Sequence, residues 1–208
     1  MQPSQPQNKK IIGITTFAAI AYGVIHDQVT AHLCVEYFTV AHPPLFHTQS
    51  PTILALCWGI TATVGVGAVL GVILAEVSQS EGLAPYPVAR LVRSIFILLA
   101  TMALIAFLAG VLGFELSRHA VLFLPISLAE LIPADRRDAF MAVWFAHAAN
   151  YLVGLAGGAF LSLRIWRQRG KPRVLALLPQ TRPAVIRALI LAALILLIMY
   201  VRFAHSMQ

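Results

Sequence analysis

The sequence predicts an all-α protein, a polytopic membrane helix bundle of about five transmembrane helices. Of its 208 residues, 59% are hydrophobic and only 11% are charged, and the mean hydropathy is +0.81, outside the range of ordinary soluble domains. Apolar runs of about 20 residues recur along the chain, and a helix of that length crosses the hydrocarbon layer with its backbone groups satisfied internally. No soluble domain fits between these runs, so we expect residues 1–208 to form a single transmembrane domain.

Each expected span begins and ends where the apolar run does. The first run starts directly after Lys10 and continues too far to be a cleaved signal peptide. The five spans cover about 11–31, 52–76, 91–114, 139–163 and 184–201. Residues 120–133 are also apolar, but Pro125 and Pro133 interrupt them. They predict an interfacial or re-entrant segment at the outer face in place of a sixth span.

The distribution of Lys and Arg predicts that the N-terminus is inside and the C-terminus outside (N-in/C-out). Basic residues in short loops stay on the cytoplasmic side of a membrane. With this topology the inner set is Lys9, Lys10, Arg90, Arg93, Arg164, Arg167, Arg169, Lys171, Arg173, Arg182 and Arg187, against Arg118, Arg136, Arg137 and Arg202 outside. We assign this excess charge to contacts with the anionic headgroups of the lipid bilayer, and expect no nucleic-acid partner.

All seven histidines then fall on the outer side or in the outer half of a span. Most lie in the stretch IHDQVTAHLCVEYFTVAHPPLFH at 25–47, which also carries carboxylates. Imidazoles and carboxylates on one face are what a metal site or proton-handling site requires, because both offer lone pairs near neutral pH. The expected metal ligands are His26, Asp27, Glu36, His42, His47, Glu115, His119 and His147.

Helical geometry ranks these candidates. The apolar part of the first span rises only about 22 Å, so His26 and Asp27 fall within the outer leaflet. Ionisable groups at that depth usually face the bundle interior, either in a functional site or paired with a neighbouring helix. In the first span's continuation, His32 and Glu36 would share a helix face. Tyr37 and Phe38 suit the membrane interface, and the prolines at 43, 44 and 51 predict a structured outer loop.

The fourth span carries one polar stripe. His147, Asn150, Tyr151 and Gly154 recur at helical spacing, so the stripe faces protein, where it serves either helix association or metal binding. In the second span, the glycines at 59, 65, 67 and 71 predict packing positions. Cys34 and Cys57 both belong to the outer half, where an oxidising compartment permits a disulfide between them.

These residues support three functions. The first is a metal site, with zinc, iron, copper or manganese as the ion, in an enzyme acting on a lipophilic substrate with Asp27 or Glu36 as general base. The second is a b-type haem held by His26 and His147 in a quinone-linked electron-transfer subunit. The third is a non-catalytic accessory or assembly subunit whose partners are other membrane subunits. No nucleotide-binding, serine-hydrolase, zincin or covalent-haem motif occurs, and whether the chain is an enzyme stays undecided.

Two stretches carry a resemblance. HDQVT at 26–30, with CVEYFT at 34–39 and His42-Pro43, resembles a segment of an uncharacterised family of small polytopic bacterial membrane proteins. AHAANYLVG at 146–154 is similar to that family's other recognisable stretch. The resemblance implies a bacterial membrane setting and brings no catalytic role. Together with the predicted topology, it leads us to expect a multi-pass protein of the bacterial inner (cytoplasmic) membrane whose site faces the periplasm.

Overall fold

The computed structural model describes residues 5–80 and 83–169 as helices joined by short connections. Four helices are long: α1 (Gln5–Leu33), α3 (Pro51–Gln79), α4 (Val88–Arg118) and α6 (Arg137–Gln168). Three are short: α2 (Glu36–Val40), α5 (Ile126–Leu131) and the 3₁₀ helix η1 (Ala134–Arg136). No strand occurs among the described residues, which confirms the all-α class. The predicted fifth span, residues 184–201, lies outside the described residues.

Prolines set where most of these elements begin. Pro51 is the first residue of α3, and Pro87, Pro125 and Pro133 directly precede α4, α5 and η1 with extended backbone angles. Proline suits this position because it has no N–H, and the first turn of a helix leaves its N–H groups without intrahelical partners. Residues 120–133 therefore form a turn, a six-residue helix and a second turn, and no sixth span.

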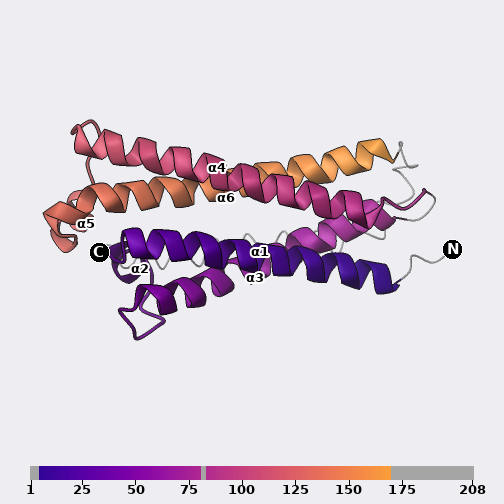
Figure 1. Ribbon diagram of the computed structural model, residues 1–208, viewed down its shortest axis with the longest axis horizontal. Coiled ribbons are helices and arrows are strands. Elements are labelled where there is room, and N and C mark those ends of the chain that lie inside the picture. The colour runs from indigo at the N-terminus through magenta and orange to yellow at the C-terminus, as the bar shows by residue number, and fades with distance from the viewer. Residues whose placement is uncertain (1–4, 81–82, 170–208) are drawn as a thin grey trace.

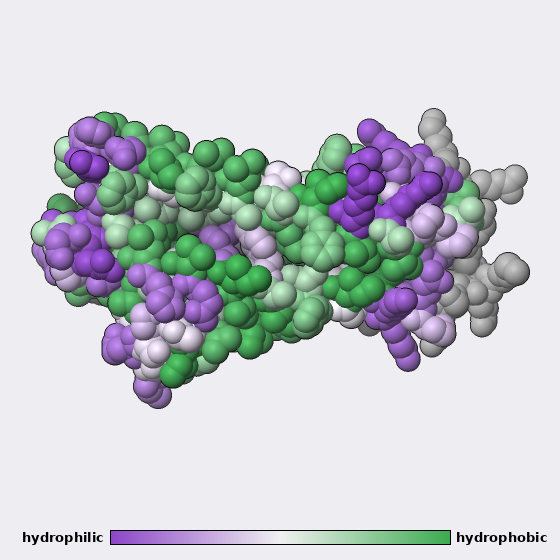
Figure 2. Space-filling model, viewed as in Figure 1, coloured by the Kyte–Doolittle hydropathy of each residue, from purple (hydrophilic) through white to green (hydrophobic). Residues whose placement is uncertain are grey.

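Three described helices are long and apolar enough to cross a membrane: Pro51–Gln79, Val88–Arg118 and Ala134–Gln168 with η1 included. Figure 2 shows the corresponding band of apolar side chains around the middle of the molecule, with hydrophilic side chains gathered at both ends. α1 is not among the three, because lysines at its start and polar residues from His26 onward make it less apolar. It is nevertheless 29 residues long and lies alongside the others (Figure 1).

The long helices form two pairs, α1 with α3 and α4 with α6 (Figure 1). Contacts within each pair are far more extensive than contacts between the two pairs. Glycines on the face of α3 that meets α1 make the first pair close: a Cβ added to Gly59 would lie 2.7 Å from Val24 Cα. One on Gly67 would lie 2.7 Å from Ala19 Cβ. Glycine permits this approach because it has no side chain. The prediction for Gly65 was wrong, since no atom of the described residues lies within 4 Å of a Cβ there.

Apolar cores close both ends of the bundle. At the end that carries α2 and α5, which we call the α2–α5 end, side chains of α2, α3, α5 and α6 pack around Phe38, Leu54 and Phe140. At the opposite end, Ile11, Leu74 and Ile165 form a second core with their neighbours. Each core joins side chains of both helix pairs, and the polar cluster described next lies beside the first core.

Candidate metal centre

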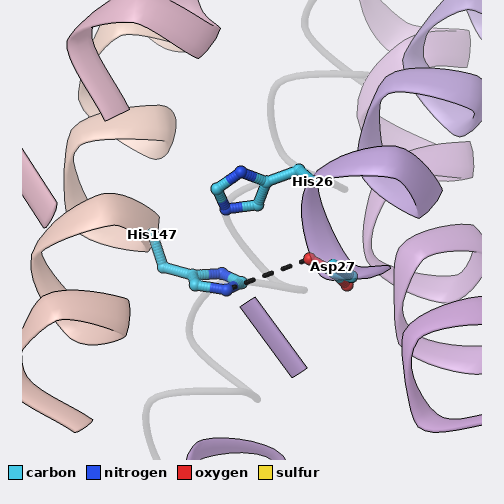
Figure 3. Close-up of side chains that lie close together, drawn as sticks. All are labelled: His26, Asp27 and His147. Carbon is cyan, nitrogen blue, oxygen red and sulfur yellow. Dashed lines mark ion pairs between the residues drawn. The ribbon is translucent and has the colours of Figure 1, made fainter. Parts of the chain in front are cut away.

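Three of the eight predicted ligands come together between the two helix pairs. His26 and Asp27 are successive residues of α1, and His147 projects from α6 toward them (Figure 3). One donor atom from each lies within 4.8 Å of the other two. Asp27 and His147 are only 6% and 5% exposed. Two imidazoles and a carboxylate therefore converge from helices that are 120 residues apart in sequence.

Hydrogen bonds within the protein satisfy the polar atoms of this cluster only in part. His147 Nε2 lies 3.9 Å from Asp27 Oδ1, which is longer than a hydrogen bond. His26 Nε2 is buried and has no hydrogen-bond partner among the described residues. A buried polar atom left in this state costs about 1–3 kcal/mol, so such atoms are usually paired. A cation between the three side chains would supply the missing partner, and the donor set fits one.

Hydroxyl groups of α1 support the cluster. The Thr30 hydroxyl donates to the carbonyl of His26 at 3.1 Å, and its oxygen lies 3.2 Å from His147 Nε2. The Tyr22 hydroxyl donates to Asn150 Oδ1 at 2.7 Å. Since Tyr22 is on α1 and Asn150 on α6, this bond fixes the two helices one turn away from the cluster. Asn150 thus has a helix-association role, one of the two predicted for its stripe.

Aromatic rings of α2 roof the cluster. The rings of Tyr37 and His147 have centroids 4.6 Å apart, and those of Phe38 and His147 are 5.7 Å apart. Tyr37 and Phe38 are 8% and 2% exposed. The sequence predicted them at the membrane interface; in the structure the chain turns back at Cys34 and lays α2 over α6, so both side chains are buried against the bundle. The roof excludes water from the donors below it.

Glu36 is placed to hold α2 and does not join the cluster. α1 ends at Leu33, so the predicted shared face of His32 and Glu36 is not formed. Glu36 instead accepts hydrogen bonds from the Arg136 guanidinium and the Cys34 thiol, and Arg136 also donates to the carbonyl of Leu33. Burial alone would raise the pKa of the Glu36 carboxyl, but a hydrogen bond from its own backbone, those from Cys34 and Arg136, and the charge of Arg136 together lower it. Glu36, the second predicted general base, is therefore held in an ion pair that supports the fold.

Replacing Glu36 by glutamine is expected to destabilise the fold by about 1 kcal/mol at pH 7, because the pair with Arg136 is partly exposed. The lowered pKa makes this contribution complete above the ordinary value of 4.5, and it is lost as pH falls through the folded-state pKa. Unfolding in mixed micelles at pH 7 and at pH 3 measures it. Glu130→Gln, an exposed carboxylate on α5, is the control. A wild-type advantage equal at both pH values would contradict this role.

The remaining predicted ligands lie apart from the cluster. His42 Nδ1 lies 2.9 Å from the carbonyl oxygen of Tyr37, and burial lowers the pKa of His42 while that hydrogen bond partly offsets the effect. His47 is exposed on the loop before α3. Glu115 and His119 form an i, i+4 ion pair of 3.3 Å at the end of α4, with side chains 48% and 71% exposed. Cys34 and Cys57 are both free thiols.

The haem alternative does not fit this geometry. A b-type haem held by His26 and His147 needs its porphyrin between the two imidazoles. Their ring centroids are 4.7 Å apart with the rings edge to face, so they touch each other directly. No space for a macrocycle lies between them. The donor set suits a single ion: two imidazoles and one carboxylate are the ligands of many catalytic zinc and non-haem iron sites, which leave further positions for water or substrate.

The sequence analysis did not identify two residues that support the site, Tyr22 and Arg136. Tyr22 precedes His26 by one helical turn, and their rings stack at 6.0 Å, so the i, i+4 spacing was a usable signal. Arg136 lies 100 residues from Glu36, and no local pattern indicates their pairing. Comparison with known proteins adds no assignment, since no family model, curated protein or solved structure matches the chain.

Proposed function

We propose that the chain is an integral membrane protein that binds one divalent transition-metal ion through His26, Asp27 and His147. The observation that carries the proposal is the convergence of these donors, within 4.8 Å, with no hydrogen bond joining the carboxylate to His147. Zinc, iron, copper and manganese all accept this mixture of nitrogen and oxygen ligands. The ion would supply Lewis acidity or, for iron and copper, redox chemistry.

The arrangement supports a metal-dependent enzyme that acts on a lipophilic substrate. The chain's own part is to hold the ion with three ligands, exclude bulk water through Tyr37 and Phe38, and offer Asp27 as a proton acceptor. The cluster lies between α1 and α6, and α6 is one of the helices long and apolar enough to cross a membrane. The exposed apolar side chains of Ile25 and Val29 flank His26 and Asp27 on α1. A membrane-soluble molecule can therefore approach it from the side.

The charge distribution supports an outward-facing site in the cytoplasmic membrane. At the end opposite to α2 and α5, the described residues include Lys9, Lys10, Arg90, Arg93, Arg164, Arg167 and Arg169. Among the described residues, the arginines at the α2–α5 end are Arg118, Arg136 and Arg137. Arg136 and Arg137 already donate to Glu36 and to the carbonyl of Ala129. By the preference of basic residues for the cytoplasmic side, the metal site faces outward and the N-terminus inward.

Elemental analysis of the untagged, detergent-purified protein tests the proposal. We expect about one metal ion per wild-type chain, and a loss of more than about tenfold in His26→Ala and His147→Ala, because each removes a ligand. His119→Ala, which removes an exposed imidazole outside the cluster, is expected to keep its metal. No metal in the wild-type protein, or full metal in both ligand variants, would refute the proposal and favour an accessory subunit without a cofactor.

A further inference from the structure

A surface pocket of about 370 Å³ lies at the α2–α5 end, next to the metal centre. Its wall comes from α2, the first turns of α3 and the loop between them. It combines apolar and aromatic side chains with hydroxyl, amide and imidazole groups, among them Phe38, Thr39, Phe46, His47, Gln49 and Trp58. None of its lining residues is formally charged apart from the titratable His47. The pocket therefore offers uncharged polar groups, together with one exposed imidazole, beside the aromatic side chains that cover the cluster.

One layer of side chains separates this pocket from the proposed ligands. Phe38 lines the pocket and is 2% exposed, and its ring also lies 5.7 Å from that of His147. Trp58 lines the pocket as well, and its ring lies 4.6 Å from His42. His42 stacks on Phe38 at 5.5 Å with the two rings nearly parallel. Movement of the Phe38 ring would connect the pocket to the metal centre.

The imidazoles form a sequence from the surface inward. His47 is exposed on the pocket wall, and His42 is half-buried behind Phe38 and Trp58. His147 follows, since Tyr37 touches both rings, 5.1 Å from His42 and 4.6 Å from His147. His26 is last, 4.7 Å from His147. Imidazole is the commonest metal ligand in proteins, so each step offers a ligand to a cation that has lost part of its hydration shell.

Other approaches to the centre are less suitable for an ion. From the side, a divalent cation would have to cross hydrocarbon, which is strongly unfavourable. From the opposite end, it would have to pass the second apolar core and the close contact of α1 with α3. We infer that the metal ion enters and leaves from the aqueous phase through this pocket, with His47 and His42 as transient ligands and Phe38 as the gate.

This inference rests on the proposed function, and kinetics test it separately from metal content. Cobalt(II) is added to metal-free protein in detergent and its uptake is followed by visible absorbance, and release is then measured with excess EDTA. In the double variant His42→Ala/His47→Ala, uptake and release are expected to slow by about tenfold each. The dissociation constant should stay within about threefold of wild type, because both rates change together.

Phe38→Ala is expected to have the opposite effect, with uptake and release both faster by about tenfold. His32→Ala is the matched control, because His32 is an exposed histidine at the same end whose partners are the Gln28 carbonyl and Thr52. Unchanged rates in the double variant, with one cobalt bound per chain, would overturn the route and leave the proposed function intact. A wild-type protein that binds no cobalt would overturn both. If Phe38→Ala fails to fold, the double variant alone decides.

Discussion

Replacing Asp27 by asparagine is expected to weaken metal binding by more than about 100-fold while leaving the metal-free protein at least as stable as wild type. The two effects have opposite signs for a physical reason. The Asp27 carboxylate is 6% exposed and makes no hydrogen bond to His147, so its negative charge is costly in the metal-free state. Asparagine keeps the size of the side chain and removes that charge, together with the attraction to a cation.

The measurement is a pair of thermal melts in detergent, with and without added metal, together with a metal titration. Glu115→Gln removes an exposed carboxylate outside the cluster and is expected to change neither property. A structural role for Asp27 predicts another result, because breaking a buried ion pair with His147 would destabilise the metal-free protein by about 3–5 kcal/mol. That outcome, with unchanged metal affinity, would assign Asp27 to helix pairing.

Replacing Gly67 by alanine is expected to destabilise the bundle by about 1–3 kcal/mol. The added Cβ would lie 2.7 Å from Ala19 Cβ and 2.9 Å from Thr16 Cα, so α1 would have to move away from α3. Because His26 and Asp27 are on α1, the same shift is expected to weaken metal binding. Unfolding in mixed micelles measures the first effect, and a metal titration measures the second.

Gly65→Ala is the matched control for Gly67→Ala. It makes the same chemical change on the same helix, two residues away, where no atom in the described part of the chain lies within 4 Å of the new Cβ. We expect it to be neutral or slightly stabilising, since alanine favours a helix more than glycine does. Equal stability of the two variants would show that α1 and α3 are not in the close contact described here.

The helical architecture follows from hydropathy, because a span must be apolar along its whole length and that property is visible locally. The three proposed ligands were also predictable for local reasons: His26 and Asp27 interrupt a span too early to reach water, and His147 begins a polar stripe on an apolar helix. The sequence did not show that these residues meet, since their contact depends on how α1 and α6 are placed. The structure provides that placement.

Glu36 shows where local reasoning failed. Its spacing from His32 predicted one continuous helical face, but α1 ends at Leu33, where Arg136 takes up the last carbonyl and draws Glu36 into an ion pair. A partner 100 residues away cannot be identified from helical periodicity. The prediction of Glu115 and His119 as metal ligands failed for a related reason. Their i, i+4 spacing predicts that the two side chains touch, but not that they face the interior of the bundle.

The most direct test of the metal centre is X-ray absorption spectroscopy at the edge of the metal that co-purifies with the untagged protein. Coordination by His26, Asp27 and His147 predicts a first shell of nitrogen and oxygen at about 2.0–2.2 Å, with the scattering pattern of two imidazoles and no sulfur. The imidazole contribution is expected to fall in His147→Ala and to stay unchanged in His119→Ala. A sulfur-containing shell would place the ion at Cys34 or Cys57 and contradict this account.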